Sequence, residues 1–392
     1  LVLCDFNLGD GLNGQQLLRD LRHINRLSHT TLFVVVSAER TKDIVLGTIE
    51  CEPDGYIAKP FTQGDFKNRI TRLVQQQMVF KEYGQALDKK DYVAAFSIAD
   101  QIRADQPKYS NLALRKKAGV LYELKSYEEA LALFNIALEK HIQTWAQIGR
   151  ARCIAEMGDV TQAIVEFEQI IANNGLAVPA IDSLAVCHLR EGRKKEAQQA
   201  VVKSIALSPM SIERQRWLGE LSVDVGDLET AVKANRSVLK LAKGTLKESQ
   251  KQYEVFSRTL RKSIELESDS KIVREQIQEG RKVLKDGLAK FEEAESLKVN
   301  DSLYRALDKF KQGDAEETIA IIDATLERHK ELFGDDTELL IDIAETKLFA
   351  DDRPGAESIL RKLMKDHKSN KALVDRVQAI LDIPLPHHQR IL

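Results

Sequence analysis

The feature that most constrains this chain is a turn that recurs about every 34 residues. Beyond Gly64 the apolar residues keep a helical spacing nearly to the end of the sequence. The turn is marked by Asp91-Tyr92, Ser126-Tyr127, Gly158-Asp159, Gly226-Asp227 and Gly313-Asp314, and the turns of the first five units are 35, 33, 34 and 34 residues apart. A fixed period of this length indicates stacked helical units that bury a core only together.

Aligning the chain on this turn gives five consecutive units, 76–109, 111–144, 144–177, 178–211 and 212–245, and two further units at 299–332 and 337–370. Each unit has small residues at matching positions, which would let its two helices approach closely. These are Ala118, Ala151, Ala185, Gly219, Ala306 and Ala344 on first helices, and Ala95, Ala130, Ala163, Ala197, Ala231, Thr318 and Ala356 on second helices.

This unit resembles the tetratricopeptide repeat, a helix-turn-helix of 34 residues. The proline that closes the family's repeat is present at Pro107 and Pro209 and absent from the other units. The resemblance implies an all-α superhelix whose extended concave surface binds other proteins. We predict repeats 1–5 over 76–245 and repeats 6–7 over 299–370.

Residues 246–298 interrupt the period. Of these 53 residues 23 are charged, yet the apolar ones keep helical spacing, so we predict two long helices with a start near Asp269. A degenerate repeat with a solvated face is one interpretation, and a hairpin for homodimerisation or partner docking is the other. Residues 371–392 are predicted to be a capping helix and a tail.

The first 60 residues follow a different pattern, in which short apolar runs end in polar residues. The runs 1–4, 31–36 and 55–58 end in Asp5, Ser37 and Lys59, and helices are expected over 15–25 and 43–51. Alternating strands and helices predict a parallel sheet wrapped by helices. The carboxyl ends of such strands open into the crevice where ligands bind, so Asp5 is placed for chemistry.

Residues 1–75 resemble the receiver domain of response regulators. The matching residues are Asp5 with Asn7, Ser37 with Ala38, and Tyr56 with Lys59-Pro60, in that order and spacing. The resemblance implies a flavodoxin-like α/β fold in which Asp5 accepts a phosphoryl group from a sensor histidine kinase or phosphotransfer protein. By the same resemblance Asp5 and the Asn7 carbonyl help to hold Mg²⁺, Ser37 and Lys59 bind the phosphoryl oxygens, and Tyr56 is the switch residue.

The sequence supplies only the last three of the receiver's five strands. The first strand, with the acidic pair that completes the family's Mg²⁺ site, and the second strand are not found before Leu1. We therefore expect the sequence to be part of a longer gene product, and residues 1–392 by themselves to bind Mg²⁺ and accept phosphate poorly.

Bulk properties exclude several classes of protein. A net charge of −2 gives no electrostatic case for nucleic-acid binding, and no apolar run is long enough to span a membrane. Cysteines 4, 51, 153 and 187 lack the spacing of a metal site or disulfide framework, which favours the cytoplasm. No catalytic constellation is found, so an enzyme is not expected.

The sequence predicts a response regulator whose output is protein binding by the repeat array. The alternative is a constitutive scaffold with a receiver that no longer switches. Because neither Pro nor Gly lies between Gly64 and Gly84, the last receiver helix is expected to pass directly, or with a slight kink, into the first repeat and to couple the two rigidly.

Overall fold

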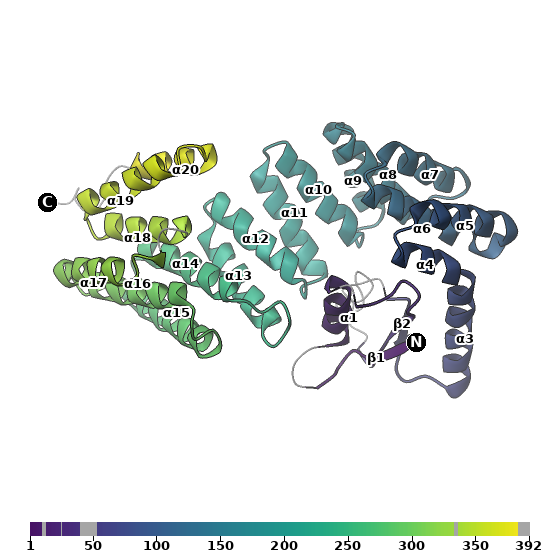
Figure 1. The fold of residues 1–392 in the computed structure, drawn as a ribbon, viewed down its shortest axis with the longest axis horizontal. Helices are drawn as coiled ribbons and strands as arrows, with labels where there is room; N and C mark the ends of the chain where they lie inside the picture. The colour runs from purple at the N-terminus through teal and green to yellow at the C-terminus, as the bar shows by residue number, and fades with distance from the viewer. Residues whose placement is uncertain (10–12, 25, 40–52, 333–335, 383–392) are drawn as a thin grey trace. The chain divides into compact units, whose positions relative to one another are not determined.

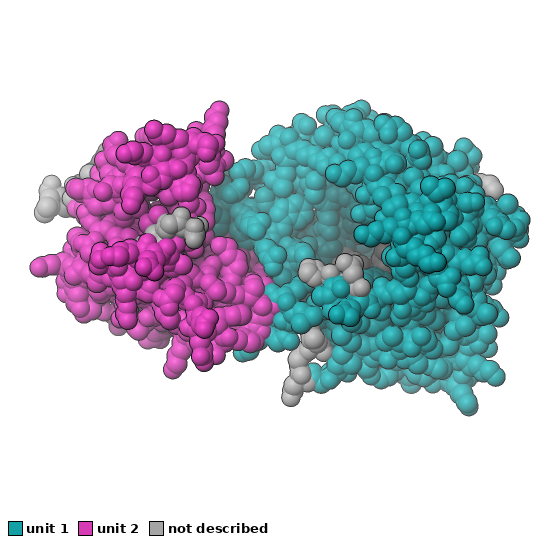
Figure 2. Space-filling view, in the orientation of Figure 1, with its two compact units in different colours: residues 1–226, 240–247 teal, residues 227–239, 248–392 magenta. Residues whose placement is uncertain are grey.

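The structure is a computed structural model that describes residues 1–9, 13–24, 26–39, 53–332 and 336–382. The predicted helix over 43–51 and the tail from 383 lie outside these residues. The chain forms two compact units, residues 1–226 with 240–247 and residues 227–239 with 248–392, coloured separately in Figure 2. Each unit is described by itself.

The N-terminal part of the first unit is a three-stranded parallel sheet with the order β1-β2-β3. Its strands are β1 (Val2–Asp5), β2 (Phe33–Ser37) and β3 (Gly55–Ala58), and its helices are α1 (Gly14–His23) and α3 (Gln63–Val79). Every residue of the central strand is buried, which explains its continuous apolar run.

The two faces of this sheet have separate cores. On one face Cys4, Phe33 and Val35 pack with Leu18 of α1. On the other face Val34, Val36 and Ile57 pack with Leu73 of α3. The register places Asp5 beside Val36 and Ser37 beside Ala58, so the polar residues that follow the strands share one edge of the sheet.

Helical hairpins make up the rest of the first unit, and consecutive helices pack against one another along the chain (Figure 1). Their helices are α4 (Lys81–Asp88), α5 (Tyr92–Asp105), η1 (Pro107–Tyr109), α6 (Ser110–Glu123), α7 (Tyr127–Lys140), α8 (Thr144–Glu156), α9 (Val160–Asn173), α10 (Val178–Arg190), α11 (Lys194–Leu207) and α12 (Ile212–Asp224). Helix α13 (Leu228–Ala242) has residues in both units.

The second unit is also built of helices. They are α14 (Gln250–Leu266), α15 (Ser270–Lys290), α16 (Glu295–Lys311), α17 (Ala315–Arg328), α18 (Thr337–Phe349), α19 (Arg353–Asp366) and α20 (Lys371–Leu381). The long pair expected within 246–298 is α14 and α15, and Asp269 caps α15 by accepting from the amides of Lys271 and Ile272. The predicted fold class, a partial α/β receiver fold followed by helical repeats, is confirmed.

The recurring turn has a common backbone conformation. One residue in each turn has φ between 59° and 105°, namely Lys90, Lys125, Gly158, Gly192, Gly226, Gly313 and Asp351. In several turns the next residue is an aspartate that caps the following helix, as Asp159 does for the Gln162 amide at 3.0 Å. The period in the sequence therefore reflects a left-handed turn residue, which an aspartate cap follows in five of these seven turns.

The small residues of the repeats lie where the helices touch. All thirteen are buried, and every one of the alanines among them has no exposed surface. Gly149 of α8 shows how tight the packing is, because a Cβ built there would lie 2.2 Å from the ring of Phe134.

Gly149→Ala is expected to destabilise the first unit by about 1–3 kcal/mol, because the added methyl overpacks the contact with Phe134. Gly119→Ala is the matched control, since a Cβ at this helical glycine meets nothing within 4 Å. The control should gain up to about 1 kcal/mol from helix propensity. Chemical denaturation followed by tryptophan fluorescence measures both, and equal effects of the two substitutions would contradict the packing argument.

The junction between the sheet and the repeats is direct, as expected, but the helix is broken there rather than slightly kinked. The chain passes from α3 to α4 without a linker, but the helix ends at Val79 and Phe80 has ψ of 9°, so the two helices are not continuous and Figure 1 shows a change of direction between them. The reason is packing: Phe80 is buried and meets Tyr83 and Tyr109 edge to face. The predicted domain boundaries and the rigidity of this junction stay predictions.

Candidate functional site

Asp5 lies at the carboxyl end of β1 and is paired with Lys59, which follows β3. The Lys59 ammonium donates to Asp5 Oδ2, and the Asn7 amide donates to Asp5 Oδ1 at 3.1 Å. The hydrogen bond from Lys59 is the largest influence that holds the pKa of Asp5 below its ordinary value. Asp5 is therefore an ionised, partly exposed carboxylate beside a cation.

Ser37 and Tyr56 meet at the backbone of Glu39. The Ser37 Oγ accepts from the Glu39 amide at 3.0 Å, and the Tyr56 hydroxyl donates to the Glu39 carbonyl at 2.7 Å. Ser37 is buried, and its carbonyl accepts from the Lys59 amide at 2.6 Å. The structure thus brings Asp5 and Lys59 into direct contact and links Ser37 with Tyr56 through Glu39, whose role lies in its backbone and left no sign in the sequence.

The residues present supply only part of a Mg²⁺ site. Mg²⁺ takes six oxygen ligands in octahedral geometry, often one or two carboxylates with waters and phosphate oxygens. Asp5 is one carboxylate, and its Oδ2 is already bound by Lys59. Within the part of the chain that the structure describes, no group of three acidic, His or Cys side chains could hold a metal ion. These residues do not fit a resident Mg²⁺ by themselves.

Helix α1 starts directly against Asp5. The Gly14 amide donates to the Phe6 carbonyl at 2.8 Å, and a Cβ on Gly14 would lie 2.4 Å from the Asp5 carbonyl oxygen. Asn13 caps the helix by accepting from the Gln16 amide, and the Gln16 side chain accepts from the Asn13 amide. A shift of the backbone at Asp5 would therefore displace the first turn of α1.

The same helix contacts the fifth repeat. The Gln16 side-chain amide donates to the Leu241 carbonyl at 3.1 Å, and the Arg19 guanidinium pairs with Glu213 at 3.3 Å. At the first repeat, Asp88 of α4 accepts from the Ser28 hydroxyl at 2.5 Å and from the His29 amide at 3.0 Å. The receiver-like part thus touches both ends of the predicted 76–245 array, through contacts that the sequence analysis missed because the partners are 59 to 225 residues apart.

Comparison with known proteins agrees with these observations. Chemotaxis protein CheY of Pseudomonas aeruginosa is 31% identical over 75 residues, which are 19% of this chain and 59% of that protein. Chemotaxis protein CheY-3 of Vibrio cholerae is 27% identical over 75 residues, 56% of its length. The chain joins a receiver-like segment to a tetratricopeptide-type array. It spans a little over half the length of the curated receiver proteins that it matches, and no family model matches it.

The structural comparison matches the chain to several solved repeat proteins, each with a TM-score below 0.5. The C-terminal part of a TPR repeat-containing protein from Cytophaga hutchinsonii is 13% identical with a TM-score of 0.41, covering 76% of this chain and 98% of that one. A tetratricopeptide repeat protein from Parabacteroides merdae is 11% identical with a TM-score of 0.39, covering 69% and 98%. MamA from Desulfovibrio magneticus, as residues 41 to the end, is 18% identical with a TM-score of 0.36, covering 44% and 97%.

Proposed function

We propose that this protein is a response regulator that accepts a phosphoryl group on Asp5 and signals by protein binding on its repeat array. The observation that carries the proposal is the Asp5–Lys59 pair at the sheet edge, with α1 starting against Asp5 and reaching the fifth repeat. A sensor histidine kinase or phosphotransfer protein would supply the phosphoryl group. The partner on the array is a protein, and no nucleic acid, membrane or catalytic activity of the array is part of the proposal.

The chain's own residues suit this chemistry. A phosphoryl group adds roughly −1.5 to −2 charges and three acceptor oxygens. Lys59 already faces the acceptor carboxylate and would neutralise part of the new charge, while Ser37 Oγ can turn from the Glu39 amide to a phosphoryl oxygen. That exchange would loosen the segment that Tyr56 also holds, so Tyr56 is the proposed switch residue.

Mg²⁺ is included in the proposal as the ion that would offset phosphoryl charge, with Asp5 and the Asn7 carbonyl among its ligands. Because the described residues supply an incomplete set, the proposal requires further oxygen ligands for this ion. A cytoplasmic location is proposed with the kinase partner. In the described segments, no helix is both long enough and apolar enough to cross a membrane.

The test is the intact mass of the complete gene product after incubation with Mg²⁺ and acetyl phosphate. We expect one added phosphoryl group in the wild type and none in Asp5→Asn. Asp105→Asn, which changes an exposed aspartate at the end of α5, is the matched control and should be modified like the wild type. A phosphoryl group that persists in Asp5→Asn would refute the assignment of the acceptor.

A constitutive scaffold with a receiver that does not switch is the second candidate, favoured by the incomplete metal site among the described residues. No mass gain in the complete gene product, with or without Mg²⁺, would support this candidate. Partner binding would then depend on the repeat surface alone.

A further inference from the structure

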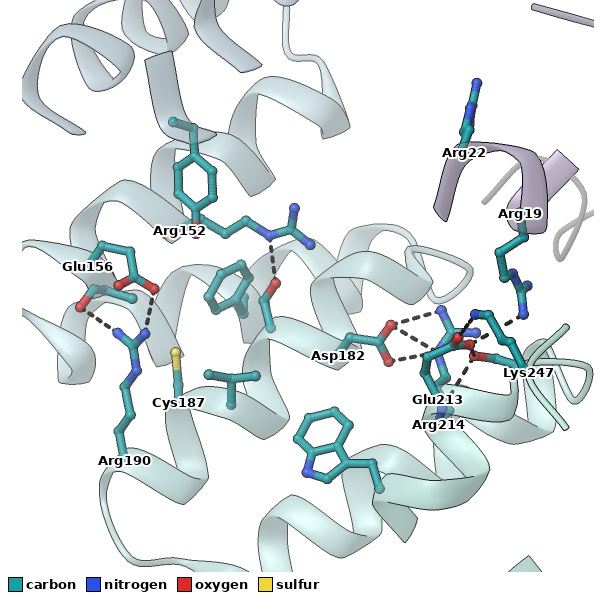
Figure 3. A pocket seen from close by; sticks show the side chains of 17 residues that line it. Arg19, Arg22, Arg152, Glu156, Asp182, Cys187, Arg190, Glu213, Arg214 and Lys247 are labelled. Carbon is teal, nitrogen blue, oxygen red and sulfur yellow. Dashed lines mark hydrogen bonds and ion pairs between the residues drawn. The ribbon is translucent and has the colours of Figure 1, made fainter. Parts of the chain in front are cut away.

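A cavity of about 1110 Å³ lies within the first unit, between α1 and four consecutive repeats. Most of its lining comes from α1 and from the first helices of repeats 2 to 5, which are α6, α8, α10 and α12; Phe167 of α9 and Lys247, which follows α13, complete it. Figure 3 shows charged side chains that reach it from these separate elements. Pockets for small ligands measure roughly 300–1,000 Å³, so this space is large enough for several side chains of a peptide.

The lining of this cavity is strongly positive. Its six cations are Arg19, Arg22, Arg152, Arg190, Arg214 and Lys247, and its three carboxylates are Glu156, Asp182 and Glu213. The lining thus has an excess of three positive charges, whereas the whole chain has a net charge of −2. The cavity therefore favours anionic ligands, although the chain as a whole is slightly acidic.

The three carboxylates are already engaged within the protein. Glu156 pairs with Arg190 at 2.5 Å, and Asp182 accepts from Arg214 at 2.8 Å and from the Ser204 hydroxyl at 2.5 Å. Although burial alone would raise the pKa of Glu213, the hydrogen bond from Lys247 and the charges of Arg19 and Lys247 hold it below its ordinary value. Each of these carboxylates is thus held in an ion pair within the protein and is not a spare acceptor.

Arg152 differs from the paired cations. Its guanidinium donates to the Ser183 hydroxyl at 2.8 Å and to the Pro179 carbonyl at 3.3 Å, and both acceptors are neutral. These bonds fix the position of the guanidinium without cancelling its charge. Arg22, on the receiver side of the cavity, is exposed on α1. The two arginines bring positive charge to the cavity from the array and from the receiver-like part.

The cavity also offers apolar contacts between its charged groups. Val186 is 40% exposed, and the half-buried rings of Tyr122 and Trp217 are part of the lining. A ligand that combines carboxylates with apolar side chains matches this surface better than a small inorganic anion does. Aromatic and arginine side chains together are also typical of protein-binding hot spots.

We propose that this composite cavity binds an acidic, partly apolar peptide segment of a partner protein, and that Arg22 and Arg152 contribute to holding it. The inference rests on the proposed function and names the chemistry of its partner. It goes beyond a repeat surface alone, because α1 supplies part of the site and begins against Asp5. If phosphorylation shifts α1, the cavity would bind the segment with a different affinity in the two states. Such a difference in affinity is what couples binding to a conformational change.

The test uses the full chain without a phosphodonor and a fluorescein-labelled octapeptide of alternating glutamate and leucine. We expect saturable binding by fluorescence anisotropy that weakens as NaCl is raised, because salt screens the attraction. Arg22→Gln with Arg152→Gln should weaken binding roughly fivefold or more. Lys195→Gln with Lys203→Gln, which removes the same charge from exposed positions outside the cavity, should leave affinity within about twofold of wild type.

Several results would overturn the inference. They are no saturable binding, equal binding of the octapeptide with glutamine in place of glutamate, equal weakening by both double variants, or tighter binding of a single-stranded oligonucleotide than of the peptide. Circular dichroism checks that each variant is folded. Phosphorylation of Asp5 without peptide binding would refute this cavity assignment alone, and peptide binding without phosphorylation would refute the switch alone.

Discussion

Asp342→Ala is expected to destabilise the second unit by about 3–5 kcal/mol, because it leaves one buried arginine and one mostly buried arginine without their main counter-ion. Asp342, on α18, is 1% exposed and accepts from Arg258 Nε with both oxygens at 2.7 Å. Arg258 and Arg261 are both on α14. Arg261 is 2% exposed, and its guanidinium lies 3.4 Å from the Asp342 carboxylate. Glu338 and Asn300 would still accept from these arginines, but neither would replace the buried charge between them.

Chemical denaturation followed by circular dichroism measures this loss. Trp145 and Trp217, the two tryptophans of the chain, both lie in the first unit, so their fluorescence shows whether that unit is unaffected. Asp366→Ala, at an exposed aspartate of α19, is the matched control and should change stability by less than about 0.5 kcal/mol.

A second variant separates charge from packing. Replacing Arg258 and Arg261 by methionine together with Asp342→Leu removes the whole buried group and keeps its volume approximately. Apolar replacements of buried ion pairs are often neutral or stabilising, so most of the stability should return. If this triple variant is as unstable as Asp342→Ala, the loss comes from packing and the electrostatic argument is wrong.

The repeat part of the fold could be predicted from sequence because its signals are local. A left-handed turn residue, an aspartate cap and a buried alanine recur at nearly the same spacing, as at Gly158, Asp159 and Ala163. The parallel sheet was predictable for the same reason, since each apolar run ends in a polar residue. The break at Phe80 was not, because it depends on an aromatic cluster with Tyr109 that no local pattern marks.

The candidate site was predictable only where strand ends place residues together. Parallel strands bring Asp5 and Lys59 to one edge, so their pairing follows from the topology. The cavity between α1 and the repeats could not be found in this way. Its ion pair between Arg19 and Glu213 joins residues 194 positions apart, and nothing in either local sequence indicates the other.

Glu265 on α14 is expected to make the second unit less stable as the pH rises from about 4.5 to about 7. Burial is the largest influence and raises its pKa from 4.5 to about 7. The positive charges of Arg261 and Lys262 lower the pKa of Glu265, and the negative charges of Glu345 and Asp342 raise it. The negative charge of Glu265 in turn acts to raise the pKa of Lys311 and of Tyr304, both on α16.

The sign follows from proton linkage. Between pH 4.5 and 7 the folded state holds a proton on Glu265 that the unfolded state has lost, so stability falls with rising pH and levels off above pH 7. The shift corresponds to about 3 kcal/mol at most. Glu265→Gln should remove this dependence, whereas Glu275→Gln, at an exposed position of α15, should keep it. Unfolding free energies of the three proteins between pH 4.5 and 7.5 test this, and parallel curves for wild type and Glu265→Gln would show that folding does not raise the pKa of Glu265.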